Sequence, residues 1–224
     1  MMTSKEAARL IDISAVRTVH SLSDIQTVVA YAQKYNFINV HVLPNWVKTL
    51  VKMLENDKEI YVGAPVGFPS GAHKTEVKLL ETKLLIEDGV EEMDIMMNVG
   101  RFKSKEYDYV QDEINQMMSI VPENVLTKVI IEVNALEEDE LEKACEIVMK
   151  SGADFLKTGT GWIPGNANLD RIRKIKQICG SEVKVKAAGG VRTPDEFLQL
   201  IDMGVERFGI NTKSAIEIVE SFDH

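Results

Sequence analysis

Short apolar runs alternate along the chain with longer segments whose apolar residues recur every three or four positions. The short runs have the length and β-branched content of buried strands. The longer segments have the periodicity of helices that cover one face of a sheet. The clearest predicted strand covers residues 128–133, and a clear predicted helix covers residues 22–35 with Ile25, Val28 and Ala32 on one face. Strands that alternate with helices predict an α/β fold with a parallel sheet.

The alternation repeats eight times without a linker or low-complexity break. Strands are predicted at residues 10–14, 39–43, 61–66, 92–97, 128–133, 155–158, 183–187 and 206–209. Helices are predicted at residues 22–35, 46–54, 75–88, 105–121, 137–150, 169–178, 194–203 and 213–221, after a helical turn at 4–9. The pattern favours a single compact (β/α)8 TIM barrel over residues 1–224. An open doubly wound sheet is disfavoured because the chain has no GxGxxG or GxxxxGK[ST] loop.

Composition and charge limit the classes of molecule that the protein is expected to bind. The formal charge of −9 and the pI of about 5.1 argue against nucleic acid and anionic membranes as partners. A small anionic substrate stays open, because the local field of a site can oppose the net charge. The histidines form no HxH or HExxH motif, so neither a metal nor another cofactor is expected, and Cys145 and Cys179 are interpreted as reduced core residues. No signal segment or membrane span is recognisable, which favours the cytoplasm.

A lysine stands at the end of the predicted sixth strand, where α/β barrels keep their chemistry. Lys157 follows the apolar pair Phe155-Leu156 and precedes a run of threonines and glycines. An ammonium group forced into a barrel mouth loses solvation, which lowers its pKa and makes the amine available to attack a carbonyl. The alternative at this point is a lysine that pairs with an acid for structural reasons.

Side-chain alternation indicates further charges inside the barrel. Lys184 and Lys186 share one face of the seventh strand, and the valines on the other face suit the layer between sheet and helices. The same rule groups Glu92 with Asp94 and Met96, and Lys128 with Ile130 and Glu132. Inward charges are costly unless paired, so this number of them predicts a polar site at the barrel mouth.

The spacing of three of these charges suggests an activated amine. Lys157 and Lys186 lie on successive strands, which run about 4.8 Å apart when hydrogen-bonded. Two ammonium groups at that separation repel each other, and the cheaper state leaves one of them neutral. Asp94, two strands earlier, is placed to offset the remaining charge and to move protons.

Two loops near the end of the chain are candidates for binding a phosphate. Gly189 and Gly190 follow the seventh strand, and Asn211, Thr212 and Lys213 precede the last helix. Loops after strands seven and eight, with free N–H groups at a helix start, form a common phosphate site in such barrels. An ordinary glycine turn followed by a helix cap would give the same pattern.

Four segments together resemble the deoxyribose-phosphate aldolase family. They are VGFPSG at 66–71, EMDIMMNVG at 92–100, FLKTGTG at 155–161 and KVKAAGGVRT at 184–193, and the resemblance runs from about Leu10 to Ser221. It implies a metal-free class I aldolase on a (β/α)8 barrel. Such an enzyme cleaves 2-deoxy-D-ribose 5-phosphate to acetaldehyde and D-glyceraldehyde 3-phosphate, and homodimers are common in the family.

The same resemblance implies a role for each catalytic candidate. Lys157 matches the Schiff-base lysine, Lys186 the second lysine that depresses its pKa, and Asp94 the aspartate of the proton relay. Thr160, in the lysine motif, joins the substrate-binding candidates.

The chain departs from the family pattern at five places. Asp12-Ile13-Ser14 stands for the usual Asp-His-Thr, the region of His41 replaces a common cysteine, and Gly159 replaces a serine. The segments WIPGN at 162–166 and GINTKS at 209–214 also differ from the family, the latter from its final phosphate motif. Two alternatives therefore stay open: a Schiff-base aldolase for another aldehyde, phosphorylated or not, and a sugar-phosphate-binding barrel without turnover.

Overall fold

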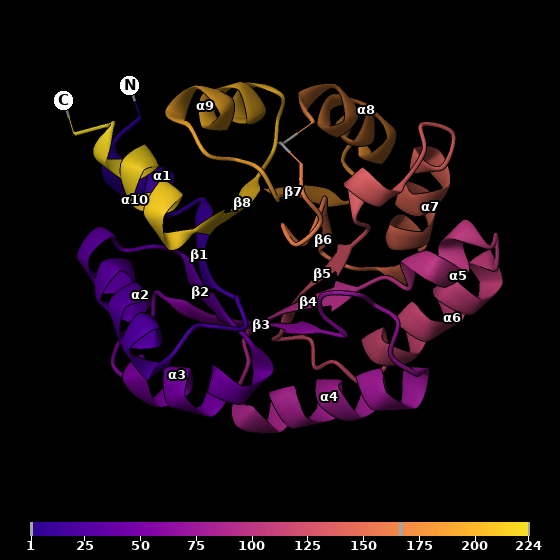
Figure 1. The fold of residues 1–224 in the computed structure, drawn as a ribbon, viewed down its shortest axis with the longest axis horizontal. Coiled ribbons are helices and arrows are strands. Elements are labelled where there is room, and N and C mark those ends of the chain that lie inside the picture. Colours follow the sequence, from indigo (N-terminus) through magenta and orange to yellow (C-terminus); the bar gives the residue numbers. More distant parts are fainter. Residues whose placement is uncertain (1, 166–167, 224) are drawn as a thin grey trace.

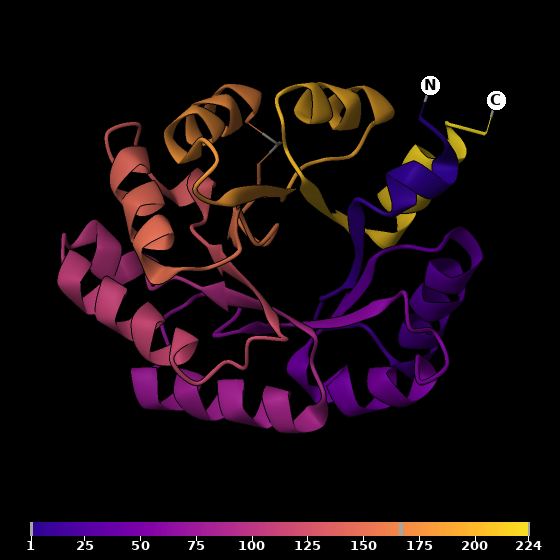
Figure 2. The ribbon, with the colours of Figure 1, turned by 180° about the vertical axis from the view of Figure 1, so that it is seen from behind.

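Eight parallel strands close into a barrel in the computed structural model, which describes residues 2–165 and 168–223. Each strand pairs with the next one along the chain, and β8 pairs with β1 to close the ring. Helices surround the strands on all sides in the view along the shortest axis (Figure 1) and from behind (Figure 2). The predicted (β/α)8 fold is confirmed.

The strands lie close to their predicted positions. Their bounds are β1 Ile11–Ala15, β2 Asn39–Val42, β3 Tyr61–Val66, β4 Glu92–Met96, β5 Leu126–Ile130, β6 Phe155–Lys157, β7 Lys184–Ala188 and β8 Arg207–Asn211. The prediction of a strand over residues 128–133 is wrong at its end. Glu132 adopts a left-handed backbone with φ of 53° and leads into the 3-10 turn η2 Val133–Ala135, although the apolar run continues beyond Ile130.

The helices follow the predicted order. Their bounds are α1 Ser4–Ala8, α2 Leu22–Tyr35, α3 Val47–Met53, α4 Thr75–Asp88, α5 Val99–Lys103, α6 Tyr107–Met118, α7 Leu141–Ser151, α8 Leu169–Cys179, α9 Pro194–Asp202 and α10 Thr212–Glu220, with a 3-10 turn η1 at Pro44–Trp46. The helix predicted over residues 105–121 is confirmed as α6 with shorter ends, while α5 was not predicted and is separated from α6 by Lys105, which has a φ of 60°.

The apolar core is the layer between the strands and the helices. Side chains such as Ile95, Leu156 and Val185 point outward from the strands and are fully buried there. Cys145 and Cys179 lie in the same layer as free, buried thiols, as predicted. The inward faces of the strands are left to carry polar groups.

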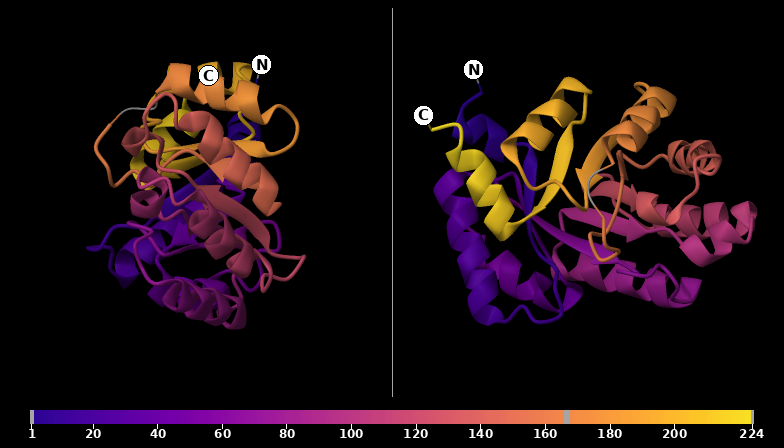
Figure 3. Two further views of the ribbon diagram at one scale, coloured as in Figure 1. Left: turned by 90° about the vertical axis from the view of Figure 1, so that its right-hand side faces the viewer. Right: turned by 45° about the horizontal axis from the view of Figure 1, so that its top comes forward.

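The two ends of the described chain meet on one side of the barrel. α1 lies beside α10 in the opposite views of Figures 1 and 2, and the two views of Figure 3 show the helices wrapped around the strands. Across residues 2–165 and 168–223, every helix is too short or too polar to serve as a membrane span.

Candidate active site

A cavity of about 370 Å³ opens at the carboxyl ends of the strands. Its walls come from β1, β2, β3, β6, β7 and β8 and from loops that follow these strands. The predicted site residues that line it are Lys157, Thr160, Lys186, Gly189, Gly190, Asn211, Thr212 and Lys213. The structure therefore gathers eight of the nine predicted site residues around one cavity.

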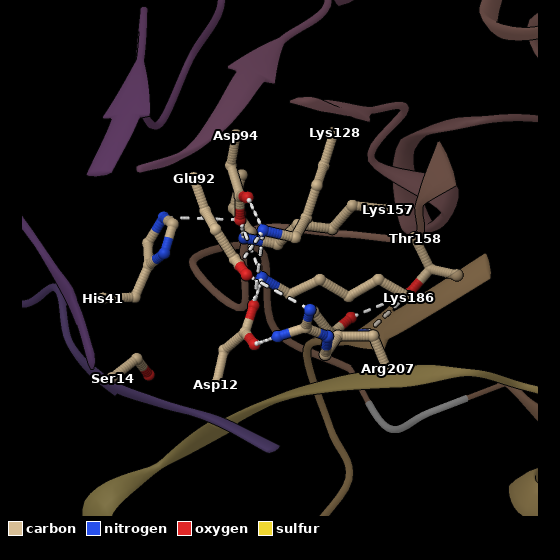
Figure 4. Close-up of polar contacts among 12 residues, drawn as sticks. Asp12, Ser14, His41, Glu92, Asp94, Lys128, Lys157, Thr158, Lys186 and Arg207 are labelled. Carbon is tan, nitrogen blue, oxygen red and sulfur yellow. Dashed lines mark hydrogen bonds and ion pairs between the residues drawn. The ribbon is translucent and has the colours of Figure 1, made fainter. Parts of the chain in front are cut away.

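The ninth predicted residue, Asp94, lies fully buried and ties the two lysines together. Lys157 Nζ donates a hydrogen bond to Asp94 Oδ2 at 2.7 Å, and Lys186 Nζ donates to the same oxygen at 2.9 Å (Figure 4). Lys157 and Lys186 are direct neighbours in the register of β6 and β7. The strand alternation thus brings the predicted trio into contact.

These three residues belong to a larger buried cluster of charges. Its members are the acids Asp12, Glu92 and Asp94 and the bases Lys128, Lys157, Lys186 and Arg207. Three carboxylates face four basic groups, so the cluster is electrically neutral only when one base has lost its proton. A net charge in a low-dielectric interior is costly, which favours that neutral state.

Lys157 is the base best placed to be neutral. Lys186 bonds two carboxylates, at 2.5 Å to Asp12 and 2.9 Å to Asp94, whereas Lys157 bonds Asp94 alone. Burial lowers the pKa of Lys157 to about 8, and Lys186 and Lys128 act in the same direction against the opposing pull of Asp94. An appreciable share of the amine is therefore neutral at neutral pH, on a side chain that lines the cavity.

Two acids of the cluster, Asp94 and Asp12, stay ionised. Burial alone would raise the pKa of Asp94, but His41, Lys157 and the neighbouring lysines hold it well below its ordinary 3.8. Asp12 behaves in the same way, since Lys186, Arg207 and Lys128 outweigh its burial and lower its pKa. Asp94 is thus a carboxylate that can accept hydrogen bonds from both lysines.

Two charged residues that were predicted to point into the barrel, Lys184 and Glu132, lie outside the charge cluster. Lys184 is exposed, with Nζ 5.5 Å from the centroid of the Phe155 ring, so its predicted place inside the barrel is wrong. It stands at the opposite end of β7 from the cavity, where the interior meets solvent. Glu132 lies beyond the end of β5 and accepts hydrogen bonds from the Thr160 backbone N–H at 3.2 Å and from the Thr160 hydroxyl.

The carboxylate of Glu132 accounts for one departure from the family pattern. A Cβ added at Gly159 would lie 2.8 Å from Glu132 Oε1 and 3.3 Å from the Ala188 carbonyl oxygen. Glycine therefore leaves room for the acid that fixes the loop after Lys157. The Thr160 hydroxyl donates a hydrogen bond to Glu132, and Thr160 therefore helps to hold the conformation of this loop. Asn166, the last residue of the altered 162–166 segment, lies outside the described residues.

The predicted phosphate-binding segments form the rim of the cavity. Gly189 and Gly190 have φ values of 83° and 112°, and a Cβ at Gly189 would lie 3.1 Å from the Gly161 nitrogen. Asn211 caps α10 by accepting a hydrogen bond from the Ser214 N–H at 3.1 Å, and Lys213 extends into solvent. The turn and the helix cap are both real, and both face the cavity.

Comparison with known proteins agrees with this geometry. A model of the DeoC/LacD family aldolases matches residues 10–211. The chain belongs to the DeoC/LacD aldolase family. It is therefore a carbon–carbon lyase. It is 41% identical to a deoxyribose-phosphate aldolase of Rhizobium meliloti (strain 1021), over 97% of this chain and 88% of that protein. It is 39% identical to one of Thermococcus kodakarensis, over 98% of both chains.

A solved structure shares the fold of this aldolase closely. QR15, described as an aldolase, superimposes with a TM-score of 0.90 at 35% identity, covering 97% of this chain and 96% of that one. In the part of this aldolase that the structure describes, no group of three or more His, Cys, Asp or Glu side chains is arranged to hold a metal ion.

Sequence reasoning missed several residues of this aldolase's site. Asp12 and His41 sit on predicted strands at inward positions and line the cavity, and Arg207 closes the charge cluster from β8. The alternation rule applied to the first, second and eighth strands would have found them. Arg17 and Arg192 lie on loops, where no periodicity signals them.

The missed arginines make the mouth of the cavity basic. Arg17 donates to the Gly161 carbonyl at 2.7 Å and lies 5.4 Å from the Trp162 ring centroid, which holds it at the rim. Among the described residues that line the cavity, the basic side chains are Arg17, Lys157, Lys186, Arg192 and Lys213, and Asp12 is the acidic one. The local charge of the site thus opposes the net charge of −9 and suits an anionic ligand.

Proposed function

We propose that this aldolase reversibly cleaves 2-deoxy-D-ribose 5-phosphate to acetaldehyde and D-glyceraldehyde 3-phosphate through a Schiff base on Lys157. The observation that carries the proposal is the buried Lys157 amine, bonded to Asp94 at 2.7 Å on the floor of a basic cavity. Relatives named deoxyribose-phosphate aldolase at about 40% identity over nearly the whole chain support the choice of substrate.

The first half of the reaction forms the Schiff base. The neutral amine of Lys157 attacks C1 of the open-chain sugar, and the resulting carbinolamine loses water to give a protonated iminium. Its depressed pKa allows Lys157 to supply the neutral amine near neutral pH. We propose that Asp94 and Lys186 exchange protons during the dehydration. These two residues contact each other and lie close to the Lys157 amine.

The second half breaks the carbon–carbon bond. A base removes the proton of the C3 hydroxyl. We assign the role of this base to a water molecule held by Asp94 and Lys186. The C2–C3 bond then breaks, because the two-carbon product carries C1 and C2. C3 becomes the aldehyde of D-glyceraldehyde 3-phosphate, and the bonding electrons move into the iminium to leave an enamine on Lys157. Protonation of the enamine at C2 and hydrolysis of the new iminium release acetaldehyde and restore the amine.

The rim is proposed to hold the phosphate. The N–H groups at the start of α10 and the turn at Gly189-Gly190 offer donors, as loops after strands seven and eight do in many barrels. Arg192 and Lys213 add positive charge at the same rim. This basic rim supports a phosphorylated substrate over a neutral aldehyde, although the 209–214 segment differs from the family motif.

Turnover measurements with wild type and Lys157→Ala side by side test the proposal. Wild type should cleave 2-deoxyribose 5-phosphate far faster than unphosphorylated 2-deoxyribose, and the variant should be inactive on both. Efficient turnover of an unphosphorylated aldehyde pair alone would favour the alternative substrate. Binding of the sugar phosphate without turnover of any aldol pair would favour the non-catalytic barrel.

The wider setting is also proposed. The sequence pattern suggests that residues 1–224 act as one domain in the cytoplasm. The family resemblance suggests a homodimer that acts on small molecules in carbohydrate catabolism. Sedimentation of the purified protein would test the dimer.

A further inference from the structure

His41 is a buried polar side chain that the proposed chemistry does not use. It projects inward from β2, is 3% exposed and lines the cavity beside Lys157 and Lys186. Its Nε2 faces Asp94 Oδ2 at 3.4 Å, the oxygen that both lysines also bond (Figure 4). Within the described residues this nitrogen makes no hydrogen bond of standard geometry.

The position of the ring depends on a glycine in the next strand. Gly63 of β3 is the direct neighbour of His41 in the strand register. A Cβ at Gly63 would lie 2.2 Å from His41 Nδ1 and 2.7 Å from the Asn39 amide, so the imidazole occupies space that any other residue would fill. The barrel is therefore shaped to keep His41 against Asp94.

The ring is neutral in this setting. Burial lowers the pKa of His41 well below 6.5, and the nearby lysines act in the same direction against Asp94. A neutral imidazole carries one hydrogen, on either Nδ1 or Nε2. The partners of each nitrogen decide between these two tautomers.

The neighbours of the ring select the Nε2–H tautomer. Asp94 is ionised and can only accept, so a bare Nε2 lone pair facing it would be buried and repelled. With hydrogen on Nε2, Nδ1 is an acceptor, and the atom of Asn39 that lies 3.3 Å from it is the amide oxygen Oδ1, which is also an acceptor. The amide nitrogen of Asn39 has no other partner among the described residues, and half a turn of that amide directs it at Nδ1. With the amide in that orientation, the Nε2–H tautomer gives a partner to His41 Nε2 and to the Asn39 amide nitrogen, two groups that are otherwise unpaired.

We infer that His41 is a positioning residue whose Nε2–H bonds Asp94 and limits the hold of Asp94 on the proton of Lys157. The carboxylate stabilises the ammonium form of Lys157 through their 2.7 Å bond. A neutral donor to the same oxygen draws charge from that bond without adding a cation to the cluster. His41 therefore favours the neutral amine. This inference rests on the proposed Schiff-base function of Lys157.

Other charged groups also face Lys157 and Asp94 and are held constant by the test. They are Asp12 of β1, Glu92 of β4, Lys128 of β5, Lys186 of β7 and Arg207 of β8, together with the buried Glu132 beyond the end of β5. Substitution at position 41 leaves each of them in place.

Two substitutions distinguish three possible roles of His41: a neutral hydrogen-bond donor, a cation, or a side chain that only fills space. His41→Gln keeps a neutral N–H donor, and His41→Leu keeps similar bulk without one. The rate of borohydride trapping of acetaldehyde on Lys157 is measured from pH 6 to pH 10 in each protein. We expect His41→Gln to follow the wild-type profile. His41→Leu should be slower by roughly threefold to tenfold at pH 7 and recover at high pH, because more of the amine is protonated. A shift in both variants would indicate a cationic His41, and a shift in neither would indicate packing alone; either result overturns the inference.

A second readout does not depend on catalysis. ¹⁵N NMR of histidine-labelled wild type, with the His41 signals assigned by their loss in His41→Gln, reports the tautomer directly. We expect the neutral Nε2–H form throughout pH 6 to pH 9. The Nδ1–H form, or an imidazolium in that range, overturns the inference even if His41→Leu fails to fold. If wild type is not trapped at all, the proposed function fails, while the NMR result still decides the tautomer.

Discussion

Replacing Lys186 by methionine removes one charge from the buried cluster and leaves most of the side-chain volume. Lys186 bonds Asp12 at 2.5 Å and Asp94 at 2.9 Å, and it lies beside Lys157 in the strand register. Without it, three carboxylates would face Lys128, Arg207 and Lys157. The cluster is then neutral only when Lys157 is protonated, so the pKa of Lys157 should rise.

The size of the effect follows from the ionisation of Lys157. With a pKa of about 8, about one amine in ten is neutral at pH 7. At the ordinary value of 10.5 the share is about one in 3,000, roughly 300-fold less, or about 3 kcal/mol of barrier. Burial is the larger cause of the low pKa and persists in the variant, so we expect a loss of roughly 10-fold to 100-fold at pH 7.

The assay is the pH profile of Schiff-base formation, read by borohydride trapping with acetaldehyde. The variant should recover as the pH rises, because deprotonation restores the nucleophile. Lys184→Met is the matched control, since Lys184 lies on the same strand but is exposed at the other end of it, and its profile should equal that of wild type. An unchanged profile in Lys186→Met, with only KM raised, would refute the electrostatic role and leave Lys186 as a binding residue.

Three further predictions follow from the same structure. Arg192→Gln should raise KM for 2-deoxyribose 5-phosphate about tenfold with little change in kcat, and should not affect unphosphorylated 2-deoxyribose; equal effects on both sugars would contradict a phosphate contact. Gly159→Ala should lower kcat and destabilise the fold by about 1–3 kcal/mol in urea unfolding, because its Cβ would lie 2.8 Å from Glu132; full activity and stability would show that the loop yields freely. Lys78→Met leaves the buried Glu113 without its 2.7 Å partner and should cost about 3–5 kcal/mol in the same measurement while the trapping profile keeps its wild-type pH dependence; a shifted profile would link this remote pair to the site.

The repeating pattern of the sequence was sufficient to predict the barrel and some of its inward charges. Period-two alternation identified Lys186 and Asp94, because a parallel strand buried on both faces shows polar residues only where they point inward. The same rule failed for Lys184, since it does not say how far the barrel interior extends before it meets solvent. It also gave no warning that Glu132 would leave β5 in a left-handed conformation.

Residues whose role depends on contacts between distant segments could not be predicted. Arg17 reaches the cavity from a loop and is held by Gly161 and Trp162, far away in the chain. The need for glycine at position 63 can be explained only from the structure, because the His41 ring occupies the space that a side chain at position 63 would fill. Such relations arise from the register of the closed barrel, which local periodicity does not specify.

The most direct test of the account is the site of the covalent adduct. The protein is incubated with acetaldehyde, reduced with borohydride, digested and mapped by mass spectrometry, with Lys157→Ala treated in parallel. The account predicts an ethyl group on Lys157, formed faster as the pH rises through about 8, and no specific adduct in the variant. A specific adduct on another lysine, or none in the wild-type protein, would contradict it.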